Sequence, residues 1–222
     1  MTGRQGVSGD DSGRRPRGRP SASSRAEIER AAIRLFLAHG YADATVAMIA
    51  GASGVSRTTF FRYYHSKAEI IWAAFDRHTQ HLHMLLEADP GTEPAMTVVR
   101  RCVVEALRDS ADDEGIWMKR FQILDSSPDL RSEESAHWIS WAAAIAEHVA
   151  RRTATDPRSV VPQSIGGAVQ AAFLAVLRSW IAVPAPSAAL LPELDEELVP
   201  LCDLFQGWLD GRNGNSTSLG ST

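Results

Sequence analysis

The chain has 222 residues, which is enough for one large domain or two domains of modest size. Apolar residues make up 44% and charged residues 23%, a balance typical of a soluble globular protein. No apolar run approaches the roughly 20 residues of a membrane span, and the N-terminus lacks the apolar core of a signal peptide. We therefore expect a cytoplasmic protein without a membrane partner, in which Cys102 and Cys202 are buried thiols rather than a disulfide.

The net charge of −4 conceals an uneven distribution along the chain. Residues 1–67 hold eleven Arg and Lys against five Asp and Glu, whereas the remaining residues hold twelve against twenty-two. A basic N-terminal part on an acidic body implies that a polyanion binds the N-terminal part alone. The acidic overall balance is therefore no argument against DNA binding.

The first 22 residues are rich in Gly, Ser, Arg and Pro, and this composition predicts a disordered segment. Four arginines lie close together in the run RRPRGR, at positions 14, 15, 17 and 19. One interpretation is a solubilising tail. The other is a basic arm that reaches the DNA minor groove or phosphates, with Arg17 and Arg19 as contact residues, and the position of this run before a DNA-reading motif favours it.

Residues 24–39 are predicted to form a first helix, opened by a capping box of Ser24 and Glu27 and ended by Gly40. Residues 45–67 then predict two short helices around a tight corner. Thr45 and Ser56 are suitable N-caps, and Gly54 can take the positive φ that the corner requires.

The second short helix of this pair has two different faces. Phe60 and Tyr64, four residues apart, share one face and are expected to be buried. The opposite face carries side chains that can reach phosphates or base edges, namely Arg57, Thr58, Thr59, Arg62 and Tyr63. A short helix with an apolar back and a donor-rich front fits the DNA major groove. A solvated helix face is the alternative for Arg57 and Arg62.

This spacing resembles the helix-turn-helix of the TetR family of repressors over roughly residues 25–75. The matching residues are Thr45-Val46, Ile49-Ala50, Gly54-Val55-Ser56, the run from Thr59 to Tyr64, Lys67, and upstream the runs AIRLF and HGY. The run FFRYY and the residues around Trp72 are also similar to regulators of the mycofactocin-system type.

The resemblance implies a role for each matching position. Arg57, Thr58 and Phe61 would face bases, while Thr45, Thr59, Tyr63 and Lys67 would hold phosphates, and Arg62 belongs to the same DNA-contacting set. Two positions depart from the family pattern. Phe61 stands where the family often has tyrosine, which favours apolar contact, and Met48 replaces a residue that is often polar.

The rest of the chain predicts further helices and no strand, so we expect an all-α protein of about nine helices. A helix of about residues 66–87, opened by Ser66 and Glu69, links the motif to the body, and a later helix is expected to begin at Asp156-Pro157. The predicted domains are a disordered basic arm (1–22), a helix-turn-helix DNA-binding domain (23–67), a helical ligand-binding and dimerisation domain (68–210) and a disordered tail (211–222).

Two kinds of chemistry are not expected. His78, His81 and His83 lie on one predicted helix, but no Cys or carboxylate stands beside them at ligand spacing, so we expect no metal site. No glycine loop for nucleotides, zinc-protease helix or nucleophile elbow is present. We therefore expect neither a cofactor nor enzymatic activity.

The family resemblance implies a sensor pocket and a homodimer in the body. The candidate pocket residues are Trp117, Phe121, Trp138, Trp141 and Phe173, for which an ordinary core is the alternative. The last two helices would form a four-helix interface with a second subunit, with Leu177 and Leu201 facing the partner. Their small residues, among them Gly166-Gly167, permit close helix approach.

The expected function is a DNA-binding transcriptional regulator, most often a repressor, associated with the nucleoid. A hydrophobic, for example acyl-type, small molecule would release it from an inverted-repeat operator in double-stranded DNA. The alternative is a constitutive DNA-binding protein without a ligand response.

Overall fold

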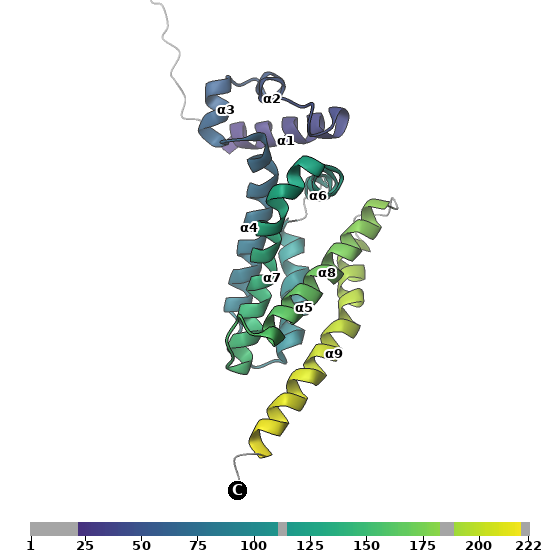
Figure 1. The fold of residues 1–222 in the computed structure, drawn as a ribbon. Helices are drawn as coiled ribbons and strands as arrows, with labels where there is room; N and C mark the ends of the chain where they lie inside the picture. The colour runs from purple at the N-terminus through teal and green to yellow at the C-terminus, as the bar shows by residue number, and fades with distance from the viewer. Residues whose placement is uncertain (1–21, 111–114, 183–188, 219–222) are drawn as a thin grey trace, which may run out of the picture.

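The computed structural model describes residues 22–110, 115–182 and 189–218, and within these ranges every regular element is helical. This confirms the all-α fold class. Nine α-helices and one 3-10 helix are described (Figure 1): α1 (Ala22–His39), α2 (Val46–Ala52), α3 (Arg57–Tyr63), α4 (Lys67–Glu87), α5 (Ala95–Ser110), α6 (Ile116–Ser126), η1 (Pro128–Leu130), α7 (Arg131–Thr153), α8 (Val160–Ala182) and α9 (Leu190–Ser218).

Helices α1, α2 and α3 form a small N-terminal unit, which we call the head. The N-caps predicted for its two short helices are confirmed: Thr45 Oγ1 accepts from the Met48 amide at 3.3 Å, and Ser56 Oγ accepts from the Thr59 amide at 3.0 Å. Gly54 turns the corner between them with a φ of +67°, a conformation that costs glycine little. The turn geometry is thus determined by residues that are local in the sequence.

The core of the head holds α3 in a fixed orientation. Phe60 and Tyr64 are both 0% exposed and pack against the apolar side chains of α1 and α2, which confirms that they share a buried face. Because these two side chains point inward, the other side of α3 must point outward.

Helix α4 leaves the head and runs down into the larger unit of α4–α9, which we call the body (Figure 1). Ser66 caps α4, as predicted, by accepting from the Glu69 amide at 3.2 Å. In the body α7 packs between α4 and α8, while α9 packs on α5 and α8. Helix α6 lies where body and head meet, against α1 and beside α4 and α8.

Helices α7 and α8 approach each other very closely at one point. A Cβ built on Gly166 would lie only 2.4 Å from the carbonyl oxygen of Ala142, so only glycine fits there. At the neighbouring Gly167 a Cβ would meet nothing within 4 Å. The expected close approach is therefore provided by Gly166, and it lies inside the body.

Three helix boundaries differ from expectation. Helix α1 begins at Ala22, so Ser24 lies inside the helix and is not its cap. Helix α8 begins at Val160 and not at Asp156-Pro157, because the Asp156 carboxylate accepts from the Arg158 amide and closes a turn first. Helix α9 continues through Ser218, past the expected end at 210, and Pro200 lies inside it without ending it.

By length and composition alone, α8 could span a membrane, with a mean hydropathy of 1.6 over its most apolar window, and 39% of that window is buried. Its buried face, which includes Ile165, Phe173 and Leu177, packs in the same core as residues of α6, α7 and α9. These contacts account for the buried part of its apolar composition.

Candidate DNA-binding surface and aromatic cluster

The outward face of α3 carries three of the predicted base-contacting residues. Arg57 and Thr58 are exposed, and Phe61 is 47% exposed although its neighbour Phe60 is fully buried. Phe61 packs edge-on against Phe60 at 5.4 Å between ring centroids, which supports its ring while leaving it accessible. The face thus offers a bidentate donor, a hydroxyl and an apolar ring, all of which can contact base edges.

The predicted phosphate contacts surround this face. Thr45 and Arg62 are exposed, and the Arg62 guanidinium lies 5.3 Å from the centre of the Tyr63 ring. The Thr59 hydroxyl lies 2.9 Å from Ser56 Oγ. The Tyr63 hydroxyl is buried and has no hydrogen-bond partner among the described residues. Arg17 and Arg19 lie outside the described residues.

Lys67 has a different environment from the one expected for a phosphate contact. Its Nζ donates to the carbonyl oxygens of Tyr41, Ala42 and Ala44 at 2.6, 2.9 and 3.2 Å, and lies 4.3 Å from the centre of the Tyr41 ring. An ammonium group has three donors, and these three carbonyls use all of them. In the free chain Lys67 therefore fastens the start of α4 to the α1–α2 loop, and a phosphate contact would require its ammonium to leave these carbonyl oxygens.

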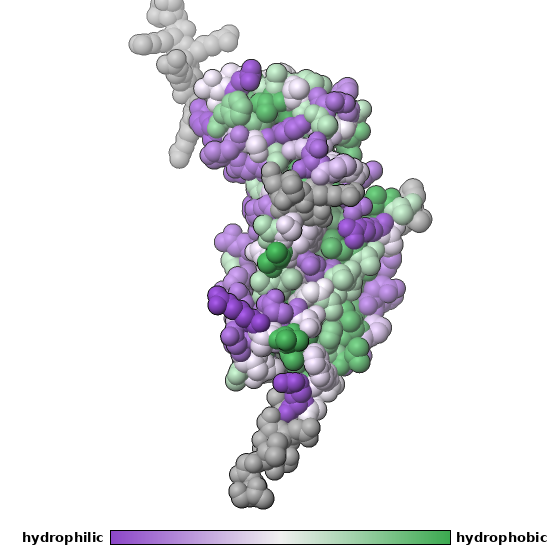
Figure 2. Space-filling model, viewed as in Figure 1, coloured by the Kyte–Doolittle hydropathy of each residue, from purple (hydrophilic) through white to green (hydrophobic). Residues whose placement is uncertain are grey.

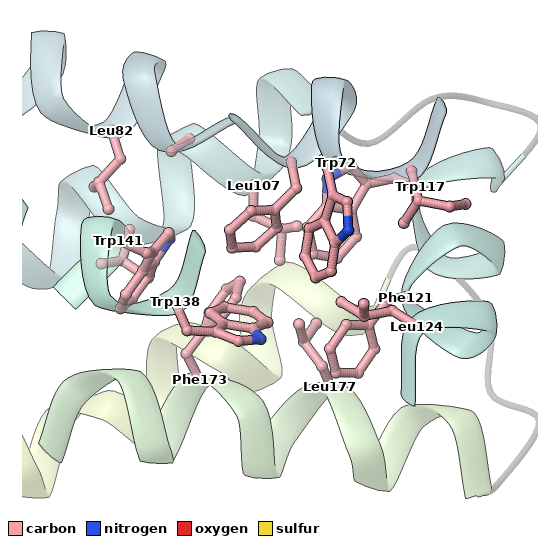
Figure 3. Packing of buried hydrophobic residues seen from close by; sticks show 14 of the residues in the cluster. Trp72, Leu82, Leu107, Trp117, Phe121, Leu124, Trp138, Trp141, Phe173 and Leu177 are labelled. Carbon is pink, nitrogen blue, oxygen red and sulfur yellow. The ribbon is translucent and has the colours of Figure 1, made fainter. Parts of the chain in front are cut away.

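The five predicted pocket residues do come together in the body (Figure 3). Trp141 stacks on Phe173 at 4.9 Å between ring centroids, and Trp138 lies 6.5 Å from both Phe173 and Phe121. Trp117 lies 6.3 Å from Phe121 and 6.4 Å from Phe173. No member is more than 6% exposed. We refer to these five side chains, from α6, α7 and α8, as the aromatic cluster.

The aromatic cluster is closely packed and contains no open pocket of ligand size. The cavity beside it has a volume of about 20 Å³ and is lined by residues of α4 and α6, including Phe75, Trp117 and Phe121. Drug-sized ligands occupy cavities of roughly 300–1,000 Å³. In this conformation the cluster is therefore core, and an apolar ligand would have to displace aromatic side chains to enter.

Sequence reasoning missed two members of this region, both on α4. The Phe75 ring lies 4.4 Å from that of Trp138, and His78 lies 5.4 Å from Trp117 and 6.0 Å from Phe173. His78 donates from Nδ1 to the Ala106 carbonyl oxygen at 3.1 Å, and burial lowers the pKa of its imidazole to about 4. The three-residue spacing of Phe75 and His78 on one helix face was the available signal.

The three histidines of α4 point in different directions. His81 Nε2 lies 2.8 Å from Asp109 Oδ2, whereas His83 Nε2 lies 3.6 Å from Glu147 Oε2 and His78 is in the core. Among the described residues, no three His, Cys, Asp or Glu side chains are grouped so as to hold a metal ion. Cys102 and Cys202 are free and buried, and burial raises the pKa of each thiol to about 11.

The outer face of the last two helices differs from expectation. Leu177 is 0% exposed, so it belongs to the core of its own subunit and does not face a partner, and Leu201 is half-buried against that core. The exposed large apolar side chains described there are instead Val160 on α8 (78%) and Val199, Leu204 and Trp208 on α9 (37%, 68% and 41%). Figure 2 shows apolar surface over this part of the body.

A three-helix head that presents α3, joined by α4 to a helical body, is the architecture of TetR-type regulators. Residues 28–74 match the family described as bacterial regulatory proteins, tetR family. Residues 93–206, more than half of the chain, match the MftR C-terminal domain. The chain therefore belongs to the TetR family of transcriptional regulators, in the group whose body is an MftR C-terminal domain.

Two relatives match most of the chain. The regulator MftR of Mycobacterium tuberculosis, named for mycofactocin biosynthesis, is 30% identical over 165 residues, which are 74% of this chain and 83% of MftR. The helix-turn-helix regulator TcmR of Streptomyces glaucescens is 29% identical over 164 residues, which are 71% of this chain and 73% of TcmR.

Solved structures of low sequence identity share the fold. NalD of Pseudomonas aeruginosa, a repressor of a multidrug efflux pump, superposes with a TM-score of 0.61 at 20% identity, covering 81% of this chain and 97% of NalD. SmeT of Stenotrophomonas maltophilia, also an efflux-pump repressor, gives 0.57 at 20% identity, covering 83% and 91% of the two chains. At this level of identity the agreement concerns the fold alone.

Proposed function

We propose that this TetR-family regulator is a cytoplasmic repressor that binds an inverted-repeat operator as a homodimer and is released by a hydrophobic small molecule. The observation that carries the proposal is the outward face of α3. There Arg57, Thr58 and Phe61 are exposed on a helix whose other side is fixed in the core by Phe60 and Tyr64. A reading helix held in this way reaches the major groove without reorganisation.

The surrounding residues support a division between base and phosphate contacts. Arg57 would pair with a guanine edge, and Phe61 would contact a thymine methyl group. Thr45, Thr59 and Arg62 border the same face and would hold phosphates, and Tyr63 would join them once its hydroxyl, buried in the free chain, turns outward. The basic arm, with Arg17 and Arg19, would add contacts to phosphates or the minor groove, since its charge precedes the head directly.

The homodimer is supported by the exposed apolar side chains on α8 and α9. Val160, Leu204 and Trp208 would be buried in a four-helix interface between two subunits. A two-fold axis through that interface would place two heads on one face of the DNA. Their half-sites would lie about one helical turn of ~34–36 Å apart, or a multiple of it, which requires an inverted repeat.

The effector is proposed from the chemistry of the aromatic cluster. Apolar rings from α6, α7 and α8 would surround an apolar ligand, for example an acyl-type compound. Because the cluster is closed in the free protein, ligand binding would have to separate these helices. The ligand would then favour a conformation in which the two heads no longer fit the half-sites, and DNA would weaken ligand binding by the same factor.

A constitutive DNA-binding protein is the second candidate, and the closed cluster is the observation that favours it. A core that never opens needs no ligand, and a cavity of about 20 Å³ holds at most about one water. The two candidates differ in tryptophan fluorescence, because Trp117, Trp138 and Trp141 all lie in the cluster. Titration with lipophilic compounds, with and without operator, separates them: equal ligand affinity in both conditions contradicts regulation by that ligand.

The DNA-binding proposal is tested by selecting sites for the full chain from random double-stranded DNA. An inverted repeat should be enriched, and Arg57→Ala should weaken binding to it by about 1–3 kcal/mol while relaxing one base preference. Arg34→Ala, at an exposed position on α1 outside the α3 face, is the matched control and should bind nearly as wild type. No enriched sequence, or equal losses in both variants, would contradict the proposal.

A further inference from the structure

Glu29 on α1 connects the head to the body through a cluster of charged and polar side chains. Its Oε1 accepts from the Tyr64 hydroxyl at 2.6 Å, at the end of α3, and its Oε2 accepts from Arg120 Nη2 at 2.7 Å, on α6. Arg25 Nε and Arg77 Nη2 lie 3.7 and 3.6 Å from Oε1. A single carboxylate thus joins α1, the end of the DNA-reading helix, α4 and α6.

The central pair of this cluster is largely removed from water. The side chains of Glu29 and Arg120 are 15% and 12% exposed, whereas those of Arg25 and Arg77 are 43% and 54% exposed. A desolvated pair contributes little net stability when intact, but removal of Arg120 would leave the buried Glu29 carboxylate with only the more exposed Arg25 and Arg77 as cationic neighbours. Burial, and then the hydrogen bond to Glu29, raises the pKa of the Tyr64 phenol well above its ordinary value.

Arg120 is also part of the region around the aromatic cluster. It lies on α6 between Trp117 and Phe121, and all three residues line the cavity of about 20 Å³ beside the cluster. A displacement of α6 that makes room among these rings must move Arg120, since the three residues share one helical turn.

Beside this ion pair, the C-terminal part of α6 and the head do not pack closely against each other. A cleft of about 360 Å³ lies between the end of α1 with the loop that follows it and the C-terminal part of α6 with η1, lined by residues 36–37, 39–43, 122–123 and 126–129. Helix α6 therefore has space beside it at its C-terminal part. Towards its N-terminal part, Arg120 holds the head through Glu29.

We propose that the Glu29–Arg120 ion pair is the coupling element through which a displacement of α6 at the aromatic cluster reaches the DNA-reading helix, with Tyr64 as the last step. In this role Arg120 is a positioning residue that acts through Glu29. The route is direct from α6 to α1 and α3, and it does not pass along α4. The inference rests on the proposed function, because it assigns the regulatory link between the two sites.

The first test measures amide hydrogen exchange in the full chain and needs neither DNA nor a ligand. Arg120→Met removes the charge while keeping an unbranched side chain, and it should speed exchange in α1 and α3 by about five-fold or more. Arg120→Lys keeps the charge and should restore part of the protection. The matched control is Arg178→Met, because the ion pair of Arg178 joins α8 to Asp125 on the same helix α6 and does not involve a residue of the head.

A second substitution in α6 separates coupling from simple loss of stability. Phe121→Leu loosens the aromatic cluster and should speed exchange in α6 and also in α1 and α3. In the Arg120→Met background it should still affect α6 but add nothing further in the head. If Phe121→Leu changes head exchange equally in both backgrounds, or if Arg120→Met leaves head exchange unchanged, the proposal is overturned.

The regulatory role of the Glu29–Arg120 ion pair is tested by fluorescence anisotropy with labelled DNA that carries the selected operator. Phe121→Leu should change operator affinity by at least about five-fold in the wild-type background and by less than two-fold with Arg120→Met. Equal changes in both backgrounds overturn the regulatory role, whatever the exchange data show. If no operator can be selected, the proposed function fails instead, and the exchange experiment still decides whether the ion pair couples α6 to the head.

Discussion

The head and the body differ in how their candidate sites are formed. The reading face of α3 is open and complete in the free chain, with Phe61 47% exposed on a fixed helix. The aromatic cluster is closed, with Trp141 and Phe173 fully buried and only about 20 Å³ of space beside it. The proposed DNA recognition would therefore use a preformed surface, whereas the proposed ligand sensing would require the body to leave its most closely packed state.

The largest expected effect concerns the contribution of the body to DNA binding. Leu204→Asp, at a side chain 68% exposed on α9, should break the proposed dimer while leaving each subunit folded. Loss of the second head should lower operator affinity by at least about 100-fold, because the two linked heads bind with a high effective concentration. Sedimentation velocity and anisotropy measure the two effects.

Ile139→Asp is the matched control for this prediction. Ile139 is also 68% exposed but lies on α7, which is not one of the two helices of the proposed interface. It should remain a dimer with nearly unchanged affinity. A monomeric Leu204→Asp variant that still binds the full operator tightly would show that the heads do not depend on the body for their affinity.

The architecture of the head follows closely from its sequence because the determining interactions are local. Thr45, Ser56 and Gly54 each act within three or four residues along the chain, and the pair Phe60 and Tyr64 is set by the helical repeat. The environment of Lys67 could not be found in this way. Its carbonyl partners lie 23 to 26 residues earlier, in a loop whose path depends on the folded head.

In the body the sequence identifies which residues are apolar but not which surface they meet. Leu177 and Leu204 are both leucines on predicted helices, yet the first is fully buried and the second is 68% exposed. The difference arises from the packing of α8 against α7 and α9, which no local rule specifies. For the same reason the five aromatic residues were found, while the choice between a pocket and an ordinary core stayed open, because it depends on side-chain packing.

The next prediction concerns the pH dependence that the closed body implies. The pKa of His78 is about 4 in the folded chain, below its ordinary value of about 6.5, because burial disfavours the imidazolium. The unfolded state therefore binds more protons between these two values. Stability should be fully present above pH 6.5 and should fall as the pH decreases toward 4, by at most about 3 kcal/mol from this group.

Urea unfolding between pH 4 and 7.5 measures this slope. His78→Leu should reduce it but not remove it, because burial also lowers the pKa of His148. An unchanged slope in His78→Leu would mean that His78 is accessible to water and that the aromatic cluster opens readily without a ligand, which would remove the contrast between head and body.

The tight packing of the body is tested by two adjacent glycines. Gly166→Ala would place a methyl group 2.4 Å from the Ala142 carbonyl oxygen and should cost about 1–3 kcal/mol of stability, because α7 and α8 must move apart. Gly167→Ala meets nothing within 4 Å and should be neutral or stabilise α8 by about 0.5–1 kcal/mol. Thermal unfolding of both variants measures the difference, and equal stabilities would show that α7 and α8 adjust freely.

The smallest expected effect on DNA binding belongs to Lys67, which holds the α1–α2 loop and is not part of the exposed face of α3. Lys67→Met should change operator affinity by less than about 0.5 kcal/mol and leave its salt dependence unchanged, because the ammonium is occupied by three carbonyl oxygens. The head itself should lose about 1 kcal/mol of stability, since these partly buried or exposed carbonyl oxygens lose a charged donor that water can replace only in part. Arg62→Met, on the exposed face of α3, is the comparison and should lower the salt slope by about one unit.

Fluorescence anisotropy titrations over a salt series measure both slopes at a temperature where each variant is folded. A loss of one unit in Lys67→Met would mean that the ammonium leaves the α1–α2 loop to bind a phosphate, so that even the head rearranges when it meets DNA.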